Sequence, residues 1–483
     1  MWKHFVKETN SFAKRYIHSL CVEGTWSPTS RIARWRNVTV KEMKIFWAIV
    51  MNMGLSKRKK LESYWAKDFV HSQPFYRQAM PLFRFQLILS MFHLSSCVSP
   101  PMGQPGYDPR VKVRHFMNMM ATNFKTYFVP SQEICIDEIT IGKKNRCKFN
   151  QYMPNKRHSM FGMKQFEVCD SKTAYILNFA FYSCKDFFND AEEPFTQKVV
   201  AHLMRDTGLL GKGYHLFTDN YYSKIPLARF LNTHKTFFTG MVNKNSKELC
   251  QTILSTKLPA GNSVYFRKKI DSSLPSKETI LFMKYQEKIT RKPVQVITTA
   301  GHAEDIIIDM RRVPNTKPAF IQKYNQFIRG VDVNDKHLYQ NIFSRMSMKY
   351  WKKIVFNIMD MAIHNAYCLY KSHNACAISK FEFMTNIIYD LSKSKDPASL
   401  NLQPVIPMVG QLSTTPSPPN IHTIKRIPNN NQKVCIVCSR SGKAKKKARF
   451  YCPSCQTGVH PDCYAEMVHQ SLSPSLNKRQ RLI

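Results

Sequence analysis

The stretch EICIDEITIG, residues 133–142, carries an aspartate inside a run of β-branched residues. Two runs of similar composition follow it, FGMKQFEVCD at 161–170 and YILNFAFYSC at 175–184. Such residues favour strands, and the Gly, Pro, Asn and Lys between the runs favour turns. This part of the chain therefore predicts three consecutive strands.

The pattern then alternates between helix and strand. Helical periodicity marks residues 193–210 and 223–234, whereas HLFTDN at 215–220 and FFTGMV at 237–242 are strand-like. Three strands, a helix, a strand, a helix and a strand make the layout of an α/β sheet.

Helical patterns dominate the sequence before and after the segments of this predicted sheet. Up to about residue 130 apolar residues recur every three or four positions, as in VKEMKIFWAIVMNMGL at 40–55. Thr39 with Glu42 forms a candidate capping box at the head of this stretch. Helical periodicity returns in KYWKKIVFNIMDMAIHNAYCLYKS at 349–372. The N-terminal region is therefore expected to be all-α.

The remaining segments differ in composition. Residues 242–317 predict a separate β-rich insert with strands in SVYFRKKI, ETILFMKY and PVQVITT, and the Pro, Ser, Thr and Asn of 393–432 predict a flexible linker. The predicted division is 1–130 helical, 131–241 sheet, 242–317 insert, 318–341 sheet, 342–392 helical, 393–432 linker and 433–470 cysteine-rich.

The charge balance points to a polyanionic partner. Lys and Arg number 72 against 32 Asp and Glu, a net charge of +40. Such a surface attracts phosphate, so nucleic acid is the favoured partner over a ribosomal-type structural role or a membrane surface. No apolar stretch approaches the ~20 residues of a membrane span, and the N-terminus MWKHFVKETN has no apolar signal core. We expect an intracellular protein without disulfides.

Near the C-terminus, cysteine and histidine recur at the spacing of metal ligands. Thiolate and imidazole are preferred zinc ligands, and a two-residue gap lets both members of a pair reach one ion. A segment this short needs metal to fold. The candidate zinc ligands are Cys435, Cys438, Cys452, Cys455, His460, Cys463 and His469.

The order of these ligands resembles a PHD or RING cross-brace. In that arrangement the first and third pairs share one ion, and the second pair binds another ion with His469. The second site is one ligand short, which leaves an unrecognised ligand, a water or a single-zinc domain open. Residues 421–483 carry 12 Lys and Arg against 2 Asp and Glu, so Lys445, Lys446 and Lys447 are candidate phosphate contacts rather than only a solvated charge run.

Carboxylates at the ends of apolar strands are the candidate catalytic groups. Asp137 follows ICI, Asp219 follows HLFT, and Asp332 and Asp335 lie in GVDVND at a helix start. Converging carboxylates can hold a pair of Mg²⁺ ions for phosphoryl transfer. Taken singly, each aspartate is more often an N-cap or turn residue than a metal ligand.

Several motifs together resemble the piggyBac transposase family. ICIDE with GKKNRCKFNQYMPNKRHSMFGMKQFEVCDS (142–171) is similar to the family's first catalytic block, FTDNYYSKIPLARFL (217–231) to the second and YNQFIRGVDVND (324–335) to the third. MNMGLSKRKKLESYWAKDF (51–69), KYWKKIVFNIMDMAIHNAY (349–367) and the cysteine-rich tail also fit. The resemblance covers roughly residues 5 to 470.

The resemblance implies a ribonuclease-H-like DDE/D catalytic core of α/β class with a β-rich insertion. An all-α dimerisation and DNA-binding domain would flank it, and a small zinc-binding cross-brace domain would follow. Asp137, Asp219 and Asp332 would bind Mg²⁺ or Mn²⁺, with Asp335 as a further catalytic acid. The implied activity, in the nucleus and as a homodimer, is excision of DNA at terminal inverted repeats through hairpin ends and joining at TTAA targets.

The sequence departs from the family pattern at two places. Arg329 stands where a glycine is common, and Arg157 stands where a proline follows the lysine. These departures bear on the efficiency of catalysis more than on the fold. The alternatives are a domesticated DNA-binding protein without strand transfer and a chromatin or ubiquitin-system reader that uses the cross-brace domain. The four retained acids favour the enzyme.

A basic stretch near the first acid is the candidate DNA contact. Its cations are interleaved with Phe149, Tyr152 and Phe161, which suits phosphate contact and stacking on unpaired bases, or else a core with solvated cations. The candidate DNA-binding residues here are Lys143, Lys144, Arg146, Lys148, Lys156 and Arg157.

Overall fold

The computed structural model forms two compact units, Met1–Leu402 and Gln403–Ile483. The structure describes residues 1–101, 103–143, 149–154, 160–182, 194–243, 249, 252, 255–269, 279–310, 313–340, 342–343, 349–393, 424–427, 431–440, 446–452 and 457–463. Among these residues no helix has the length and apolar character needed to cross a bilayer.

A mixed sheet forms the centre of the first unit. Among the described residues it has nine strands in the order β2-β3-β1-β5-β6-β9-β8-β7, with β4 paired to β3. The strands are β1 (Glu133–Gly142), β2 (Asn150–Tyr152), β3 (Phe161–Asp170), β4 (Ile176–Phe181), β5 (His215–Thr218), β6 (Phe237–Met241), β7 (Ser263–Lys269), β8 (Thr279–Tyr285) and β9 (Val294–Thr298).

The central strands fall where the sequence predicts them. β1 and β3 span the two quoted runs from end to end, and β5 and β6 lie in the two later strand-like runs. Two features were not predicted, the short strand β2 and the hairpin of β10 (Asp305–Met310) with β11 (Val313–Pro318). β2 is only three residues long, Asn-Gln-Tyr, and β11 contains two prolines, which weaken the strand signal.

The expectation of a separate insert needs correction. β9 pairs antiparallel with β6, and β8 and β7 continue outward from β9. The strands of residues 242–317 therefore extend the core sheet through a continuous hydrogen-bond ladder, and only β10 and β11 form a sheet of their own. The cause is that the outer edge of β6 pairs with β9, and the sequence pattern alone does not reveal this pairing.

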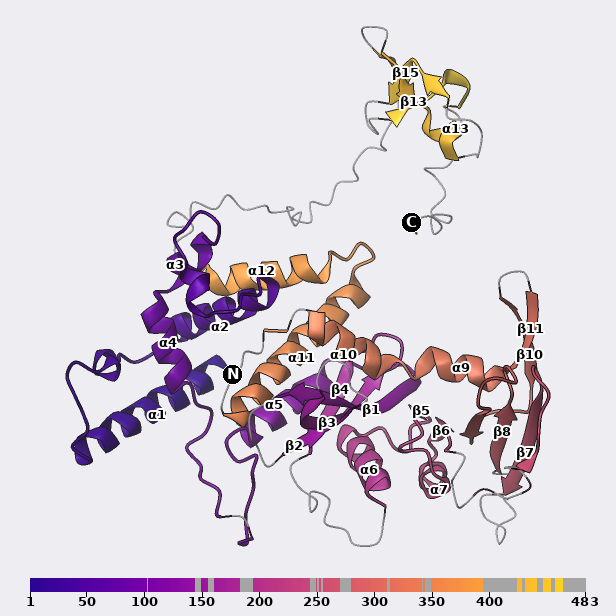
Figure 1. Ribbon diagram of the computed structural model, residues 1–483, viewed down its shortest axis with the longest axis horizontal. Coiled ribbons are helices and arrows are strands. Elements are labelled where there is room, and N and C mark those ends of the chain that lie inside the picture. Colours follow the sequence, from indigo (N-terminus) through magenta and orange to yellow (C-terminus); the bar gives the residue numbers. More distant parts are fainter. Residues whose placement is uncertain are drawn as a thin grey trace. The chain divides into compact units, whose positions relative to one another are not determined.

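Helices cover both faces of the sheet. Figure 1 shows α6 (Phe195–Thr207) and α7 (Ile225–Thr233) on one side and α10 (Gly330–Gln340) and α11 (Tyr350–His373) on the other. Because side chains alternate along a strand, Ile134 and Ile136 of β1 join the apolar cluster of α6 and α7, whereas Cys135 joins the cluster of α11. Asp137 continues the face of Cys135. Its side chain therefore belongs to the α10 side.

The helices before and after the sheet pack together. Helix α12 lies along α2, and α11 packs against α5. The other helices are α1 (Trp2–Val22), η1 (Arg31–Arg34), α2 (Val40–Leu55), η2 (Glu62–Trp65), α3 (Pro74–Ala79), α4 (Leu82–Met91), α5 (Arg114–Thr126), α9 (Ala319–Phe327) and α12 (Lys380–Ser392).

The cap of α2 forms only half of the predicted capping box. The Thr39 hydroxyl accepts from the backbone N–H of Glu42 at 3.1 Å. The Glu42 carboxylate instead accepts two hydrogen bonds from Arg84 of α4, at 2.6 and 2.7 Å. A buried guanidinium requires a paired anion, and this requirement outweighs the second cap bond.

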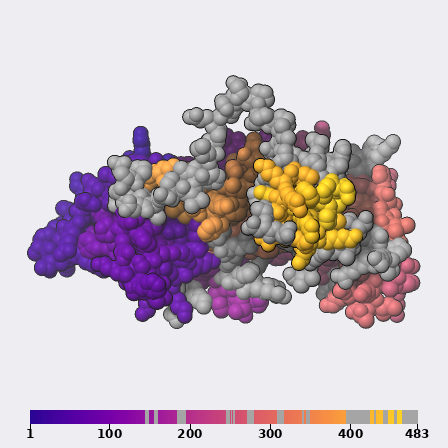
Figure 2. All heavy atoms as spheres, turned by 90° about the horizontal axis from the view of Figure 1, so that it is seen from above, coloured from indigo at the N-terminus to yellow at the C-terminus, as the bar shows by residue number. Residues whose placement is uncertain are grey.

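The second unit is small. It contains β12 (Lys425–Arg426), β13 (Lys433–Val434), α13 (Ile436–Arg440), β14 (Lys447–Ala448), β15 (Phe450–Cys452) and β16 (Thr457–Gly458). In the space-filling view its described residues gather in one compact group of yellow atoms (Figure 2). The fully buried members of its apolar cluster are Cys435, Val437, Ala448 and Val459.

Candidate active site and metal centre

Asp137 and Asp219 lie side by side because β1 and β5 are parallel neighbours. The last residues paired between the two strands are Ile136 and Thr218, so each aspartate is the next residue along its chain. Adjacent strands lie about 4.8 Å apart. Both aspartates are half-buried, and the backbone N–H of Tyr221 donates to Asp219 Oδ1 at 2.9 Å. Two carboxylates from distant blocks thus meet at one sheet edge.

Helix α10 brings the third acid block onto the same face. A Cβ placed on Gly330 would lie 2.5 Å from Cys135 Sγ, so only glycine permits this approach of the helix start to β1. Asp332 follows in the first turn of α10 and is solvent-exposed, and Asp335 lies three residues further on and is half-buried. The close contact at Gly330 therefore fixes where these two acids lie relative to Asp137.

A buried amide–carboxylate contact anchors α10 further. Glu167 of β3 is directly opposite Asp137 in the β1–β3 ladder and is fully buried. Asn334 Nδ2 donates to Glu167 Oε2 at 2.6 Å, and Gln165 Nε2 donates to Glu167 Oε1 at 2.7 Å. Since Asn334 lies between Asp332 and Asp335, this contact orients the acidic turn.

Three of the candidate acids lie close enough to Tyr324 of α9 for their charges to act on its phenol. Burial raises the pKa of its phenol, and the negative charges of Asp219, Asp137 and Asp332 raise it further. Among the described residues, no three of these carboxylates have oxygens all within 4.8 Å of one another. In this arrangement the described carboxylates therefore do not surround a single ion as a group of three.

The opposite face of β1 carries a second polar cluster. Tyr222 donates its hydroxyl to Glu138 Oε2 at 2.8 Å, and Lys164 Nζ lies 3.8 Å from Glu138 Oε1. The pKa of Tyr222 is raised by burial and by the charge of Glu138. Lys164 also lies over the ring of Tyr221, with its ammonium 4.5 Å from the ring centroid.

The basic stretch is only partly described. Lys143 is 4% exposed, so it does not present its ammonium to solvent as a phosphate contact requires. The reason is its position at the end of β1, where its N–H donates to Phe161 O and its carbonyl accepts from Asn150. The predicted contacts that lie outside the described residues are Lys144, Arg146, Lys148, Lys156 and Arg157.

The aromatic residues of this stretch divide into two groups. Phe149 is buried against Phe181 and Tyr350, as the core interpretation expects. Tyr152 and Phe161 are 60% and 51% exposed, with ring centroids 4.8 Å apart. Only this exposed pair keeps the stacking surface that the sequence suggests.

Four of the predicted zinc ligands come together in the C-terminal unit. The ligand atoms of Cys435, Cys438, His460 and Cys463 all lie within 4.8 Å of one another. Cys438 Sγ is 3.6 Å from His460 Nδ1 and 3.8 Å from Cys463 Sγ. Zinc–sulfur bonds of about 2.3 Å in a tetrahedron give sulfurs about 3.8 Å apart. The cluster therefore has the dimensions of a zinc site.

Surrounding groups prepare this cluster for a cation. His460 Nε2 lies 3.1 Å from Lys447 O, which leaves Nδ1 for a metal when Nε2 carries the proton. Burial raises the pKa of the Cys435 thiol, but hydrogen bonds from the N–H groups of Cys438, His460 and Val437 lower it to about 6. Burial and the neighbouring Cys438 and Cys435 raise the pKa of Cys463 to about 11. A metal ion would relieve this repulsion.

The proposed second zinc site is mostly outside the described residues. Cys452 is fully buried on β15, whereas Cys455 and His469 lie outside the described residues, as does Lys445. Lys446 and Lys447 are exposed beside the cluster. The first half of the predicted cross-brace is thus assembled, and its second half stays a prediction.

Sequence analysis missed three side chains that contact the segments carrying the candidate catalytic acids. Glu167 and Lys164 lie inside a strand run, and Asn334 separates two candidate acids in the helix. The available signal was an acid between apolar residues, Phe166-Glu167-Val168, which implies a buried carboxylate with a partner.

Comparison with known proteins identifies the family. Residues 1–367 match the family described as Transposase IS4. The chain is 22% identical over 393 residues to human "PiggyBac transposable element-derived protein 5", covering 78% of this chain and 70% of that protein. It also matches a cryo-EM structure of a piggyBac transposase synaptic complex with hairpin DNA, with a TM-score of 0.68, 20% identity and coverage of 95% of this chain and 92% of that chain. The chain therefore belongs to the piggyBac family of transposases.

Proposed function

We propose that this protein is an active DNA transposase that cuts transposon ends and joins them to TTAA targets. The observation that carries the proposal is the convergence of three acid blocks: Asp137 and Asp219 at the adjacent ends of parallel strands, with Asp332 on a helix packed against β1. An isolated turn or N-cap aspartate has no reason to meet two others at one sheet edge.

In this proposal Asp137, Asp219 and Asp332 hold Mg²⁺ or Mn²⁺, and Asp335 supports them. The ions would lower the pKa of the attacking water or 3′-hydroxyl and stabilise the leaving oxygen. Asp219 is pre-oriented by the N–H of Tyr221, and the acidic turn of α10 is positioned by Asn334 and Gly330. These contacts hold the carboxylates before DNA arrives, as preorganised catalysis requires.

The alternative function is DNA binding without strand transfer. The departure that lies nearest to the acids is Arg329, next to the glycine that contacts Cys135. Arg329 is exposed, and its carbonyl accepts from Val333 N at 2.9 Å within the helical turn. An arginine is therefore accommodated here without disturbing the acids, which favours the enzyme.

The discriminating experiment measures cleavage and binding on the same DNA. Protein is incubated with Mg²⁺ and the DNA ends that flank its own coding sequence, and nicked and hairpin products are resolved by denaturing electrophoresis. Asp219→Asn should abolish the products while binding persists, because the amide oxygen still accepts from Tyr221 N–H. A loss of roughly three or more orders of magnitude is expected for removing a metal-binding carboxylate.

The matched control is Asp390→Asn, an exposed aspartate paired with Lys393 on α12. This variant should cleave like the wild type. Binding without cleavage by the wild-type protein would establish the alternative function instead.

We also propose that Cys435, Cys438, His460 and Cys463 bind Zn²⁺, with a second ion at Cys452, Cys455 and His469. The described ligand distances support the first ion. Exposed Lys446 and Lys447 next to the cluster support phosphate contact by this unit. Action as a homodimer in the nucleus is part of the same proposal and follows from the family resemblance.

A further inference from the structure

A cavity of about 300 Å³ lies on the α6 side of the sheet, apart from the face that carries Asp137. Among the residues that the structure describes, its lining is formed by Gln151, Lys164, Phe166, Tyr182, Phe195 and Tyr221. Four of these six described residues are aromatic. Phe195 is 5.9 Å from Phe166 and 5.7 Å from Tyr182 between ring centroids, so the rings form a continuous wall.

The cavity combines this wall with one cation. The Lys164 ammonium lies 5.0 Å from the ring centroid of Phe166 and 4.5 Å from that of Tyr221. Glu138, 3.8 Å from Lys164, is an acid in contact with the cluster, and the Tyr222 hydroxyl already donates to it. The ring of Tyr221 is 42% exposed, which leaves one aromatic face of the entrance open to solvent.

The cavity is coupled to the carboxylates through two short connections. Tyr221 forms part of its wall and donates its N–H to Asp219 at 2.9 Å. Glu138, which contacts Lys164, directly follows Asp137 in β1. Both connections run along the backbone, since the Glu138 side chain lies on the face of β1 opposite to that of Asp137.

A flat, neutral, hydrogen-bonding ring attached to a phosphate matches these surroundings. Aromatic walls stack on any nucleobase, the amide of Gln151 can both donate to and accept from a base edge, and Lys164 can neutralise an adjacent phosphate. Enzymes that act at distorted DNA pay an unstacking cost and recover it in such pockets. A paired base inside a duplex cannot enter, because its neighbours occupy both faces.

We propose that this cavity binds one unpaired base of the DNA end, with the adjacent phosphate held by the Lys164 ammonium. The proposal rests on the proposed function for its substrate, DNA. It adds the specific site and the residues that select an unpaired base. These residues are distinct from Tyr152 and Phe161, the exposed pair suggested by the sequence.

The test uses two short DNA duplexes of identical sequence without Mg²⁺, one blunt and one with a single unpaired 2-aminopurine at its end. Wild-type protein should bind the overhang duplex more tightly than the blunt one and quench its 2-aminopurine emission. Tyr221→Ala should weaken overhang binding roughly tenfold or more, the effect of removing one base–aromatic stack. Blunt binding should stay within twofold, and Tyr221→Phe should retain the preference.

Tyr127→Ala is the matched control, since Tyr127 is also an exposed tyrosine, 69% exposed, and does not line the cavity. Equal affinity of the wild type for both duplexes, or an unchanged preference in Tyr221→Ala, overturns the proposal. The readout needs neither metal nor cleavage. It therefore separates failure of the base site from failure of the transposase function, which the Mg²⁺ cleavage assay measures.

Discussion

In the sheet, Asp137 follows Cys135 and Ile136, both with no exposed surface, and apolar clusters cover both faces of the strand. In the C-terminal unit the described apolar cluster has only four buried residues, one of them the ligand Cys435. The first region positions its acids by burying apolar area. The second has too little apolar area for that and depends on its ligands.

This difference predicts which of the two candidate sites depends on metal for its geometry. The carboxylates of the sheet are carried by elements that bury apolar residues, so we expect this site to keep its form without ions. In the C-terminal unit, burial and the neighbouring Cys438 and Cys435 raise the pKa of the Cys463 thiol. Holding these sulfurs together as thiolates would require a cation, so we expect metal binding and folding to be coupled there.

The largest expected effect is on the C-terminal unit. Zinc removal by a chelator together with Cys435→Ser should unfold it, because structural zinc contributes on the order of 10 kcal/mol to such small domains. Hydrogen exchange of residues 431–463 should rise to the unprotected rate, while exchange of β1 and β3 stays unchanged. Mass spectrometry should show the lost zinc equivalents.

Cys376→Ser provides the control, since Cys376 is an exposed free cysteine of the first unit. It should change neither zinc content nor exchange. Continued protection of residues 431–463 in the metal-free protein would mean that the small apolar cluster suffices, and the contrast between the two regions would disappear.

A smaller effect is expected for the polar contact inside the sheet core. Asn334→Leu leaves Glu167 Oε2 without its amide donor in a fully buried environment. The free energy of unfolding should fall by about 1–3 kcal/mol, measured by urea denaturation. Glu167→Leu should cost a similar amount, because Asn334 then loses its partner.

The double variant tests whether the two side chains act as a pair. Glu167→Leu also removes the acceptor of Gln165, but this loss is the same in the single and the double variant. Because the double variant has no unmatched partner of the Asn334–Glu167 bond, it should lose less stability than the sum of the single variants. Additive losses would show that the contact does not hold α10 against β3.

The sequence was informative where one local pattern determines one element. EICIDEITIG and FGMKQFEVCD gave β1 and β3 with their ends, and the Cys and His spacing gave the ligand cluster. In the strands a run of β-branched and apolar residues is enough to specify the element, and in the cluster the two-residue gap between ligands is enough to specify which side chains meet. The acids of the three blocks were singled out by their positions after apolar strands and at a helix start, but their role as metal ligands came from the family resemblance, because a lone strand-end aspartate has several physical explanations.

The sequence was uninformative where position depends on distant partners. The pairing of β9 with β6 joins the predicted insert to the core, and no local signal encodes it. Lys143 was expected at a DNA surface, yet its place at the end of β1 buries it. Charge alone cannot distinguish a solvated lysine from a buried one, since that depends on packing over the whole fold.

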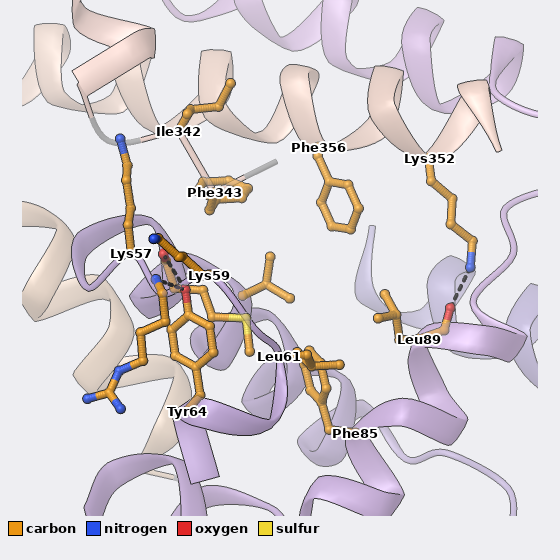
Figure 3. A pocket seen from close by; sticks show the side chains of 13 residues that line it. Lys57, Lys59, Leu61, Tyr64, Phe85, Leu89, Ile342, Phe343, Lys352 and Phe356 are labelled. Carbon is orange, nitrogen blue, oxygen red and sulfur yellow. Dashed lines mark hydrogen bonds between the residues drawn. The ribbon is translucent and has the colours of Figure 1, made fainter. Parts of the chain in front are cut away.

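The last effect is on the pH dependence of stability and concerns a buried lysine between helices of the first unit. Figure 3 shows Lys352 of α11 reaching Leu89 of α4, at a cavity of about 540 Å³ that also has Lys57 and Lys59 in its lining. The Lys352 ammonium donates to the carbonyl of Leu89. Burial, with a contribution from Lys349, lowers its pKa to about 7.

A pKa lowered in the folded state means that the unfolded chain binds more protons between about pH 7 and pH 10. Stability should therefore rise with pH in that window, by at most about 1.4 kcal/mol per pH unit for one group. Lys352→Met should flatten this rise, as followed by urea denaturation at several pH values. Lys371→Met, an exposed lysine of the same helix, should leave the slope unchanged. If Lys352→Met keeps the wild-type slope, the amine is charged in the folded protein, and its carbonyl contacts compensate for burial in a core otherwise held together by apolar packing.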